Sequence, residues 1–241
     1  MSSPTTAATR RTDSVAQRWS SYQPEDHAVW AALYRRRMAS LERQASRRFL
    51  DGLDAIDLDP DQIPDLRKVN ARLRPLTGWS ALPVAGFLEA PAFFASLAKR
   101  QFPTTVTIRS PESLDYTPAP DIFHDVFGHV PLHADPTFAD FLRQFGARAA
   151  EATDPTEVER LARLFWFTVE FGLIREGGEV RAYGSGLISS SAEAAHALSE
   201  SCERRPFDAE AAMATPFEID RLQPMLFVAE DFEELFTALG P

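Results

Sequence analysis

The chain has 241 residues, of which 44% are hydrophobic and 25% charged, which is typical of a soluble globular protein and excludes a disordered or fibrous one. Thirty-five acidic against 25 basic residues give a formal charge of −10, which argues against nucleic acid or an anionic membrane surface as a partner. The single cysteine, Cys202, excludes an internal disulfide framework and a cysteine-based metal cluster, and it favours a reducing cytoplasm as the location.

The N-terminal half combines a tail, two helices and a long loop. Residues 1–20 lack an apolar stretch and are predicted to be a mobile tail, followed by one domain over residues 21–241. Apolar residues at helical spacing predict a helix over 24–50 that ends near Gly52, and a second helix over 59–73. Prolines and glycines between Pro75 and Gly86 predict a long loop there, of a kind that often carries binding groups.

The rest of the chain is predicted to be mainly helical with little strand. We expect the helices at 91–100, 136–152, 155–175, 191–201 and 231–239. A strand is predicted at 104–108. Gly177 and Gly178 are expected to end the helix at 155–175, with a turn or strand segment after them. The fold class is therefore mainly α with minor β. The last helix is too short for a heptad seam, which predicts a monomer.

The segment PDIFHDVFGH, residues 120–129, contains His124 and His129. Five residues of a straight α-helix turn the second side chain about 140° away from the first, so one helix could not aim both at one metal. We therefore predict that the helix ends between them, at Gly128 and Pro131. The pair lacks the spacing and the glutamate of the zincin motif, and alone it is weak support for a metal.

Glu170 lies within the apolar segment LFWFTVEFGLI. Burying an ionised carboxylate costs several kcal/mol unless a cation or hydrogen-bond donors compensate it. An arginine could do so, and Arg109, Arg163 and Arg175 are candidates. Alternatively, two histidines and one carboxylate form the facial triad of non-haem iron(II) oxygenases, which leaves positions open for other ligands. The same three ligands would also suffice for a zinc hydrolase.

Several longer segments resemble one known family. They are TGWSALPVAGFL (77–88), FPTTVTIRSPESLDYTPAPDIFHDVFGHVPL (102–132), FWFTVEFGL (165–173) and RAYGSGLISS (181–190). They are similar to the catalytic domain of the tetrahydropterin-dependent aromatic amino acid hydroxylases, and most similar to short bacterial phenylalanine 4-hydroxylases. The resemblance implies a single basket-like domain that uses Fe(II), O2 and a tetrahydropterin to convert L-phenylalanine to L-tyrosine. Hydroxylation of tryptophan, meta-hydroxylation of phenylalanine and a catalytically silent ligand-binding module remain alternatives.

The resemblance also implies a role for individual residues. The iron ligands would be His124, His129 and Glu170. The substrate amino acid would be held by Arg109, Thr117, Trp166 and Ser189. The pterin would contact Gly86, Phe87, Leu88, Ala90, Phe93 and Asp125.

Some of these residues suggest more specific expectations. The Arg109 guanidinium suits a substrate carboxylate, and Ser189 would also support an iron-ligating histidine. Trp166 favours phenylalanine or tyrosine over tryptophan as substrate.

Three positions depart from the family pattern. Asp125 stands where glutamate is usual, and we expect it to reach the pterin through water. Phe165 replaces a tyrosine, which removes a hydroxyl near the iron. His133 replaces an apolar residue, and we expect it to be a solvated loop histidine rather than a fourth metal ligand.

Overall fold

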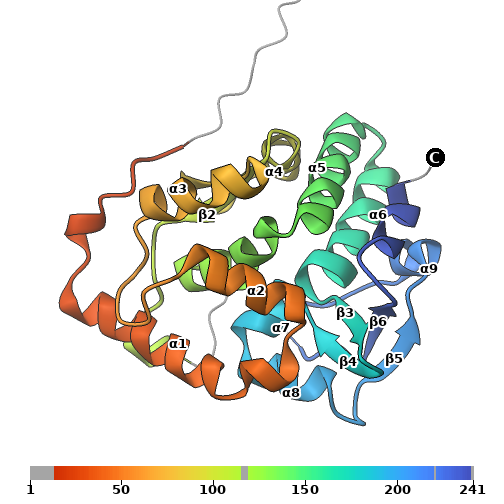
Figure 1. Ribbon diagram of the computed structural model, residues 1–241. Helices are drawn as coiled ribbons and strands as arrows, with labels where there is room; N and C mark the ends of the chain where they lie inside the picture. Colours follow the sequence, from red (N-terminus) through yellow and green to blue (C-terminus); the bar gives the residue numbers. More distant parts are fainter. Residues whose placement is uncertain (1–13, 115–118, 220, 240–241) are drawn as a thin grey trace, which may run out of the picture.

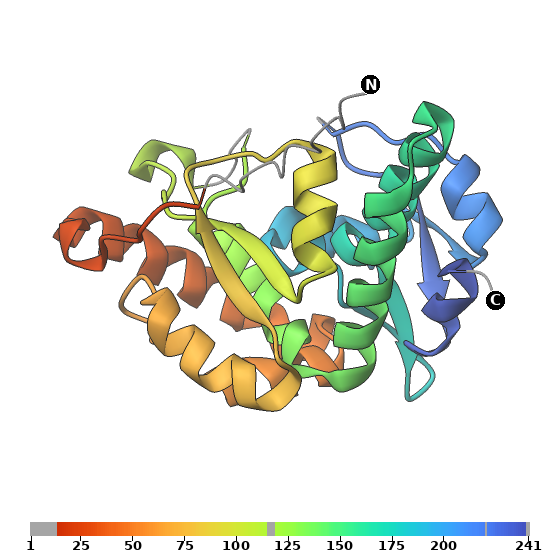
Figure 2. The ribbon, with the colours of Figure 1, turned by 90° about the horizontal axis from the view of Figure 1, so that it is seen from above.

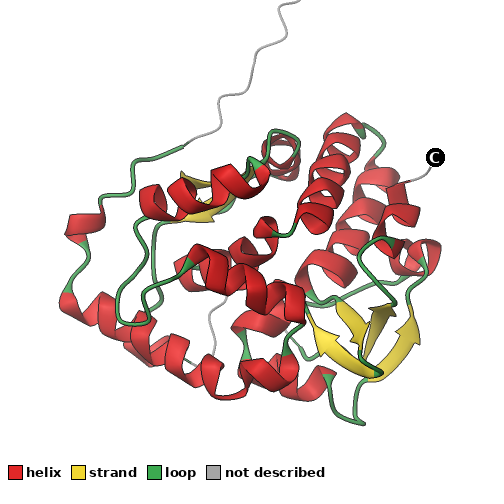
Figure 3. Ribbon diagram, viewed as in Figure 1, coloured by secondary structure: helices red, strands yellow, loops and turns green. Residues whose placement is uncertain are grey.

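Helices make up most of the computed structural model, which describes residues 14–114, 119–219 and 221–239, and strands are confined to two small sheets (Figure 3). The predicted class, mainly α with minor β, is confirmed. The α-helices are α1 (Pro24–Gln44), α2 (Arg47–Ile56), α3 (Leu66–Thr77), α4 (Ala90–Leu97), α5 (Pro136–Glu151), α6 (Pro155–Phe165), α7 (Ser185–Ser189), α8 (Ser191–Ala197) and α9 (Ala209–Ala214). The strands are β1 (Ser80–Val84), β2 (Gln101–Thr105), β3 (Leu173–Glu176), β4 (Glu179–Ala182), β5 (Glu203–Pro206) and β6 (Met225–Ala229).

Shorter helical segments of π or 3-10 geometry connect these elements. The π-helical segments are Phe123–His129 and Trp166–Glu170. The 3-10 segments are Trp19–Ser21, Pro111–Ser113, Val130–Ala134 and Glu234–Leu239. Among the described residues, no helix is both long and apolar enough to cross a bilayer.

The larger sheet has the strand order β4-β3-β6-β5, with β3 and β4 antiparallel and the other pairs parallel. Gly177 and Gly178, at φ of 61° and 84°, form the turn between β3 and β4, whereas the sequence analysis expected them to end a helix. The predicted helix 155–175 is therefore too long, because its last apolar residues belong to β3. A short apolar run does not distinguish a buried helix from a buried strand.

The smaller sheet pairs β1 with β2 in parallel, from Ser80 opposite Gln101 to Val84 opposite Thr105. The sequence prediction treated β1 as loop and placed the second strand three residues too late. Pro83 lies inside β1, where it is tolerated because both strands of a two-stranded sheet are edge strands. Residues 80–84 form a strand because they pair with β2, about twenty residues further along the chain, and a local sequence pattern does not show this pairing.

The predicted helix 24–50 is two helices separated by two extended residues, Ala45 and Ser46. Ala45 ends α1, and the Ser46 hydroxyl caps α2 by accepting a 3.2 Å bond from the Phe49 amide. Gly52 lies inside α2 instead of ending it. A Cβ on Gly52 would come within 2.1 Å of the Pro131 carbonyl oxygen, so glycine lets α2 approach the chain just beyond His129.

Residues 14–20 pack against the rest of the chain. Ser14 forms a β-bridge with Val84, and the Trp19 indole donates a 2.6 Å hydrogen bond to the Ile63 carbonyl. The part of the predicted mobile tail that the structure describes is therefore attached. Residues 1–13 lie outside the described residues.

The elements surround a buried centre. Helices α1, α2 and α3 lie on one side and α5 and α6 on the other, with the larger sheet beside α7 (Figure 1). Viewed from above, α4 and α5 lie side by side (Figure 2). The π-helical segment Phe123–His129 contacts α1, β2 and α7. All its residues except His124, which is partly exposed, are buried, so the segment that carries the two predicted histidine ligands packs inside the fold.

Candidate metal centre

His124 and His129 belong to one continuous helical segment of π geometry. In a π-helix the backbone hydrogen bond joins residues five apart, so such residues become neighbours on one face. The prediction that the helix ends between the two histidines is wrong, because it assumed the α-helical repeat. The π geometry achieves what a straight α-helix could not, which is to direct both imidazoles to one point.

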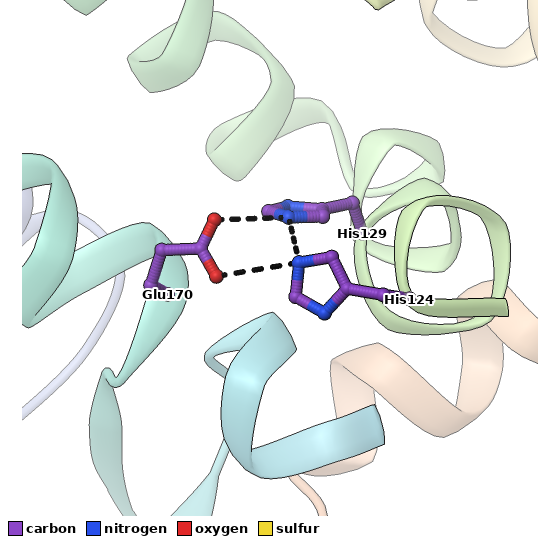
Figure 4. Close-up of side chains that lie close together, drawn as sticks. All are labelled: His124, His129 and Glu170. Atoms are coloured by element: carbon purple, nitrogen blue, oxygen red, sulfur yellow. Dashed lines mark hydrogen bonds and ion pairs between the residues drawn. The ribbon is translucent and has the colours of Figure 1, made fainter. Parts of the chain in front are cut away.

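Glu170 is the last residue of the second π-helical segment and completes the cluster (Figure 4). Its Oε1 lies 3.1 Å from His129 Nε2 and its Oε2 3.5 Å from His124 Nε2. The two Nε2 atoms are 3.2 Å apart. The three side chains are thus brought together as predicted, and they form the one candidate metal-binding group within the described ranges.

The environment sets the ionisation of these groups. Burial lowers the pKa of His124, against the opposite effect of Glu170. Burial would raise the pKa of Glu170, but the two histidines and a hydrogen bond from Ser185 outweigh it and lower this pKa to about 2. A carboxylate therefore faces imidazole nitrogens, and those are the donor types of the facial triad.

The alternative that an arginine compensates Glu170 is wrong. Arg109 pairs with Asp121, Arg163 with Glu159 and Arg175 with Glu230. The partners of the Glu170 carboxylate in the described structure are the two histidines and the Ser185 hydroxyl.

Arg109 is linked to the first histidine through Asp121. The Asp121 carboxylate accepts bonds of 2.7 and 2.9 Å from Arg109 Nε and Nη2. Its Oδ1 also accepts a 3.0 Å bond from the His124 amide. The pKa of Asp121 is lowered, because these bonds and the Arg109 charge outweigh burial. The sequence analysis did not identify this link.

Two serines of α7 contact the ligands. Ser189 Oγ lies 3.0 Å from His124 Nδ1, as expected for a residue that supports an iron-ligating histidine. Ser185 Oγ donates a 2.7 Å bond to Glu170 Oε2. Ser185 was not predicted, although its spacing of four residues from Ser189 on a helix would place both on one face. Thr117, the other predicted substrate contact, lies outside the described residues.

Comparisons with known proteins agree with this geometry. Residues 6–239 match the family of biopterin-dependent aromatic amino acid hydroxylases. The phenylalanine-4-hydroxylase of Chromobacterium violaceum is 43% identical over 91% of this chain and 74% of its own length. The rat tyrosine 3-monooxygenase is 41% identical over 88% of this chain and 43% of its own length.

The chain is a biopterin-dependent aromatic amino acid hydroxylase.

Solved structures of the family support the same assignment. The Chromobacterium violaceum phenylalanine hydroxylase with bound oxidised Fe(III) superposes with a TM-score of 0.93, at 42% identity, over 95% of this chain and 84% of that one. Other structures of that enzyme hold iron(III) with 7,8-dihydrobiopterin, at a TM-score of 0.92, or iron with phenylalanine, at 0.90.

The residues that the hydroxylase family resemblance assigned to the pterin lie between β1 and α4 or on α4, except Asp125. Gly86, Phe87 and Leu88 are in the connecting loop, and the Phe87 side chain is largely exposed. Ala90 begins α4. The Phe93 and Phe102 rings meet edge-on with their centroids 5.9 Å apart, and the centroids of the Phe102 and His129 rings are 4.4 Å apart. A series of aromatic rings therefore connects Phe93 with the metal ligands.

Asp125 and Phe165, two of the departures from the hydroxylase pattern, are both packed into the fold. Asp125 Oδ2 accepts bonds of 2.7 and 2.8 Å from the amide and hydroxyl of Thr105, which attaches the π-helical segment to β2. Burial raises the pKa of Asp125. The Phe165 and Phe93 rings meet edge-on with their centroids 5.5 Å apart, so Phe165 is next to a residue expected to contact the pterin.

His133 is not the solvated histidine that the sequence analysis expected. Its side chain is 0% exposed and stacks on Trp79 at 4.6 Å, and neither ring nitrogen has a hydrogen-bond partner among the described residues. Burial holds its pKa well below the usual value. Among the described residues, it is not part of the candidate metal group.

His133→Leu is therefore expected to stabilise the metal-free protein by about 1–2 kcal/mol at pH 7, because it removes an unsatisfied polar group from the core. The lowered pKa means that near pH 6 only the unfolded chain binds the proton, so the histidine destabilises the fold further as pH falls below about 6.5. The gain from leucine should grow between pH 7 and 5.5. Denaturant unfolding at several pH values measures it, and equal stability of both proteins at all of them would contradict the assignment.

Proposed function

We propose that the chain is an iron(II)- and tetrahydropterin-dependent monooxygenase that hydroxylates L-phenylalanine to L-tyrosine with O2. The observation that carries the proposal is the cluster of His124, His129 and Glu170, whose ligand atoms lie within 4.8 Å of one another and of which His129 is buried and the other two are partly exposed. The bacterial relatives of 40–43% identity are phenylalanine-4-hydroxylases, and the matching structures hold iron, a biopterin and phenylalanine.

The donor set fits iron(II). His124 and His129 would supply neutral imidazole nitrogens and Glu170 a carboxylate oxygen, and a set of three protein ligands would leave other coordination positions of the metal open. Iron bound here together with a tetrahydropterin would supply the activation of O2. Ser189 orients the His124 ring through Nδ1, and such outer contacts fix the tautomer of a ligating histidine.

Arg109 and Trp166 would place the substrate. Asp121 occupies the Nε–Nη2 edge of the Arg109 guanidinium, and the Nη1–Nη2 edge is a second pair of donors that suits an amino acid carboxylate. Trp166 is in the same π-helical segment as Glu170 and stacks on Phe217 at 4.2 Å with 11° between the rings. We propose that this rigid aromatic pair forms a wall of the substrate pocket.

The pterin would lie against the loop 86–88 and the Phe93 ring. This placement rests on the contacts that join Phe93 through Phe102 to His129. Main-chain groups of the loop would read the pterin's amide edge. Asp125 would act on the pterin indirectly, because Thr105 already occupies one of its oxygens.

Tetrahydropterin-dependent O2 uptake in the presence of phenylalanine tests this function. We expect uptake only when iron, the pterin and the amino acid are all present. A zinc hydrolase would consume no O2, and a catalytically silent binding module would bind phenylalanine without turnover. Either result would overturn the proposal.

Trp166→Phe is expected to shift the relative kcat/KM towards tryptophan by about 1–3 kcal/mol, since a smaller wall enlarges the pocket. Iron content should stay the same. Competition between phenylalanine and tryptophan, with products separated by chromatography, measures the shift. A preference for tryptophan in the unmutated protein would contradict the role given to Trp166.

We also propose that the protein is a cytoplasmic monomer. The location is supported by Cys202, which is free and buried, as is typical of a protein from a reducing compartment. Sedimentation velocity would show one species of about 27 kDa, and a stable tetramer would contradict the monomer.

A further inference from the structure

Helix α7 carries two hydroxyls that contact two different ligands of the proposed metal site. Ser189, near His124, was expected from the family resemblance, whereas Ser185, which donates to Glu170 Oε2, was not. The Glu170 oxygens have different surroundings, since Oε1 lies near His129 and Oε2 near both His124 and Ser185. Two of the partners of the Glu170 carboxylate in the described structure, His124 and His129, are themselves expected metal ligands. Ser185, the third partner, is not.

The position of Ser185 is fixed by glycines on both sides. A Cβ on Gly184 would come within 2.5 Å of the Glu170 carbonyl oxygen, and one on Gly186 within 3.1 Å of it. On the other side, a Cβ on Gly128 would lie 3.2 Å from the Ser185 Cβ. The backbones of three segments therefore approach closely around Ser185, which is 1% exposed. In so crowded a place the hydroxyl has little room to rotate away from Glu170.

Arg37 holds α7 from its other end. Its guanidinium donates to the carbonyls of Ile188 and, at 3.2 Å, Leu187, which are among the last residues of the helix. Arg37 is 1% exposed, and its remaining contacts within the described structure are the neutral side chains of Ser40 and Gln44. A cation at a helix C-terminus is favourable, so this contact stabilises α7 in the position that places Ser185.

We propose that Ser185 is a positioning residue that holds the Glu170 carboxylate in the orientation needed for metal binding. The proposal rests on the iron site of the proposed function and adds a residue to it. Partners in the outer shell of metal sites generally change metal affinity 10- to 100-fold. Without the hydroxyl, Oε2 loses its 2.7 Å donor, and the carboxylate can rotate about the end of its side chain.

Ser185→Ala tests the proposal, because it removes one oxygen and adds nothing to a crowded site. Ser96→Ala is a matched control, since Ser96 is also buried, at 2% exposed, and its hydroxyl donates a hydrogen bond to the Ala92 carbonyl within α4, away from the metal ligands. We would measure Fe(II) affinity by competition with a chelator, the visible spectrum of bound Co²⁺, and thermal stability without metal.

We expect Ser185→Ala to bind Fe(II) about 10- to 100-fold more weakly and to change the Co²⁺ spectrum, while the control keeps both. A residue that served stability alone would lower the melting temperature without changing the spectrum. Equal Fe(II) affinity and an unchanged spectrum in Ser185→Ala, with wild-type protein that binds iron, would overturn the role of Ser185 alone. Failure of the wild-type protein to bind iron would overturn the proposed function as well.

Discussion

Glu170→Gln is expected to abolish stoichiometric iron binding and to lower phenylalanine hydroxylation about 1,000-fold, the effect of losing about 4 kcal/mol of transition-state stabilisation. The amide has almost the same volume as the carboxylate but no charge, so it is a much weaker ligand for iron(II). The fold should be kept, because the side chain still fits between His129 and Ser185. His124→Ala and His129→Ala should lose iron for the same reason, since two ligands do not complete the facial set.

Iron content by elemental analysis, together with O2 uptake, measures this result. Glu157→Gln serves as the control, because Glu157 is a partly exposed residue that pairs weakly with Arg148. Retention of one iron per chain and of full activity in any of the three ligand variants would remove that residue from the site.

Arg109→Lys is expected to raise the KM for phenylalanine about 10- to 100-fold, with normal iron content. A lysine ammonium is a point charge and cannot bind Asp121 and a substrate carboxylate through two separate two-donor edges. The effect should be larger on KM than on kcat, because the residue acts on the carboxylate and not on the ring. Steady-state kinetics over a wide range of phenylalanine concentrations separates the two constants.

Arg35→Lys is the matched control, because Arg35 also pairs with an aspartate, Asp61, but on the exposed surface. Its KM should equal that of the wild-type protein. An unchanged KM in Arg109→Lys would show that Arg109 does not hold the substrate carboxylate. Loss of iron in the same variant would instead show that Asp121 transmits the change to His124 through its backbone contact.

The ligands could be predicted from sequence because they are a matter of residue type and family motif. The geometry of the histidine pair could not be predicted, because the segment is π-helical and does not have the 3.6 residues per turn of an α-helix. The same limit applies to β1, whose pairing with β2 depends on contacts distant in sequence. The spacing of apolar residues also predicted one helix over residues 24–50, whereas the extended residues Ala45 and Ser46 divide it into α1 and α2.

Other features of the site depend on tertiary contacts that no local pattern contains. Asp121 and Ser185 are ordinary polar residues in the sequence, and only the fold brings them to Arg109 and Glu170. His133 follows a helix and a proline, which suggests a loop, yet Trp79 and Phe102 enclose it. In each case the partner comes from another element, so the role emerges only when the chain is packed.

Identification of the product tests the central claim most directly. Iron-loaded protein would be incubated with a tetrahydropterin, O2 and L-phenylalanine, and the amino acids would be separated by chromatography that resolves para- from meta-tyrosine. We expect para-tyrosine in an amount equal to the phenylalanine consumed, and none when iron or the pterin is left out. Meta-tyrosine as the main product would contradict the 4-hydroxylase assignment, and no hydroxylated product from iron-loaded protein would contradict the whole account.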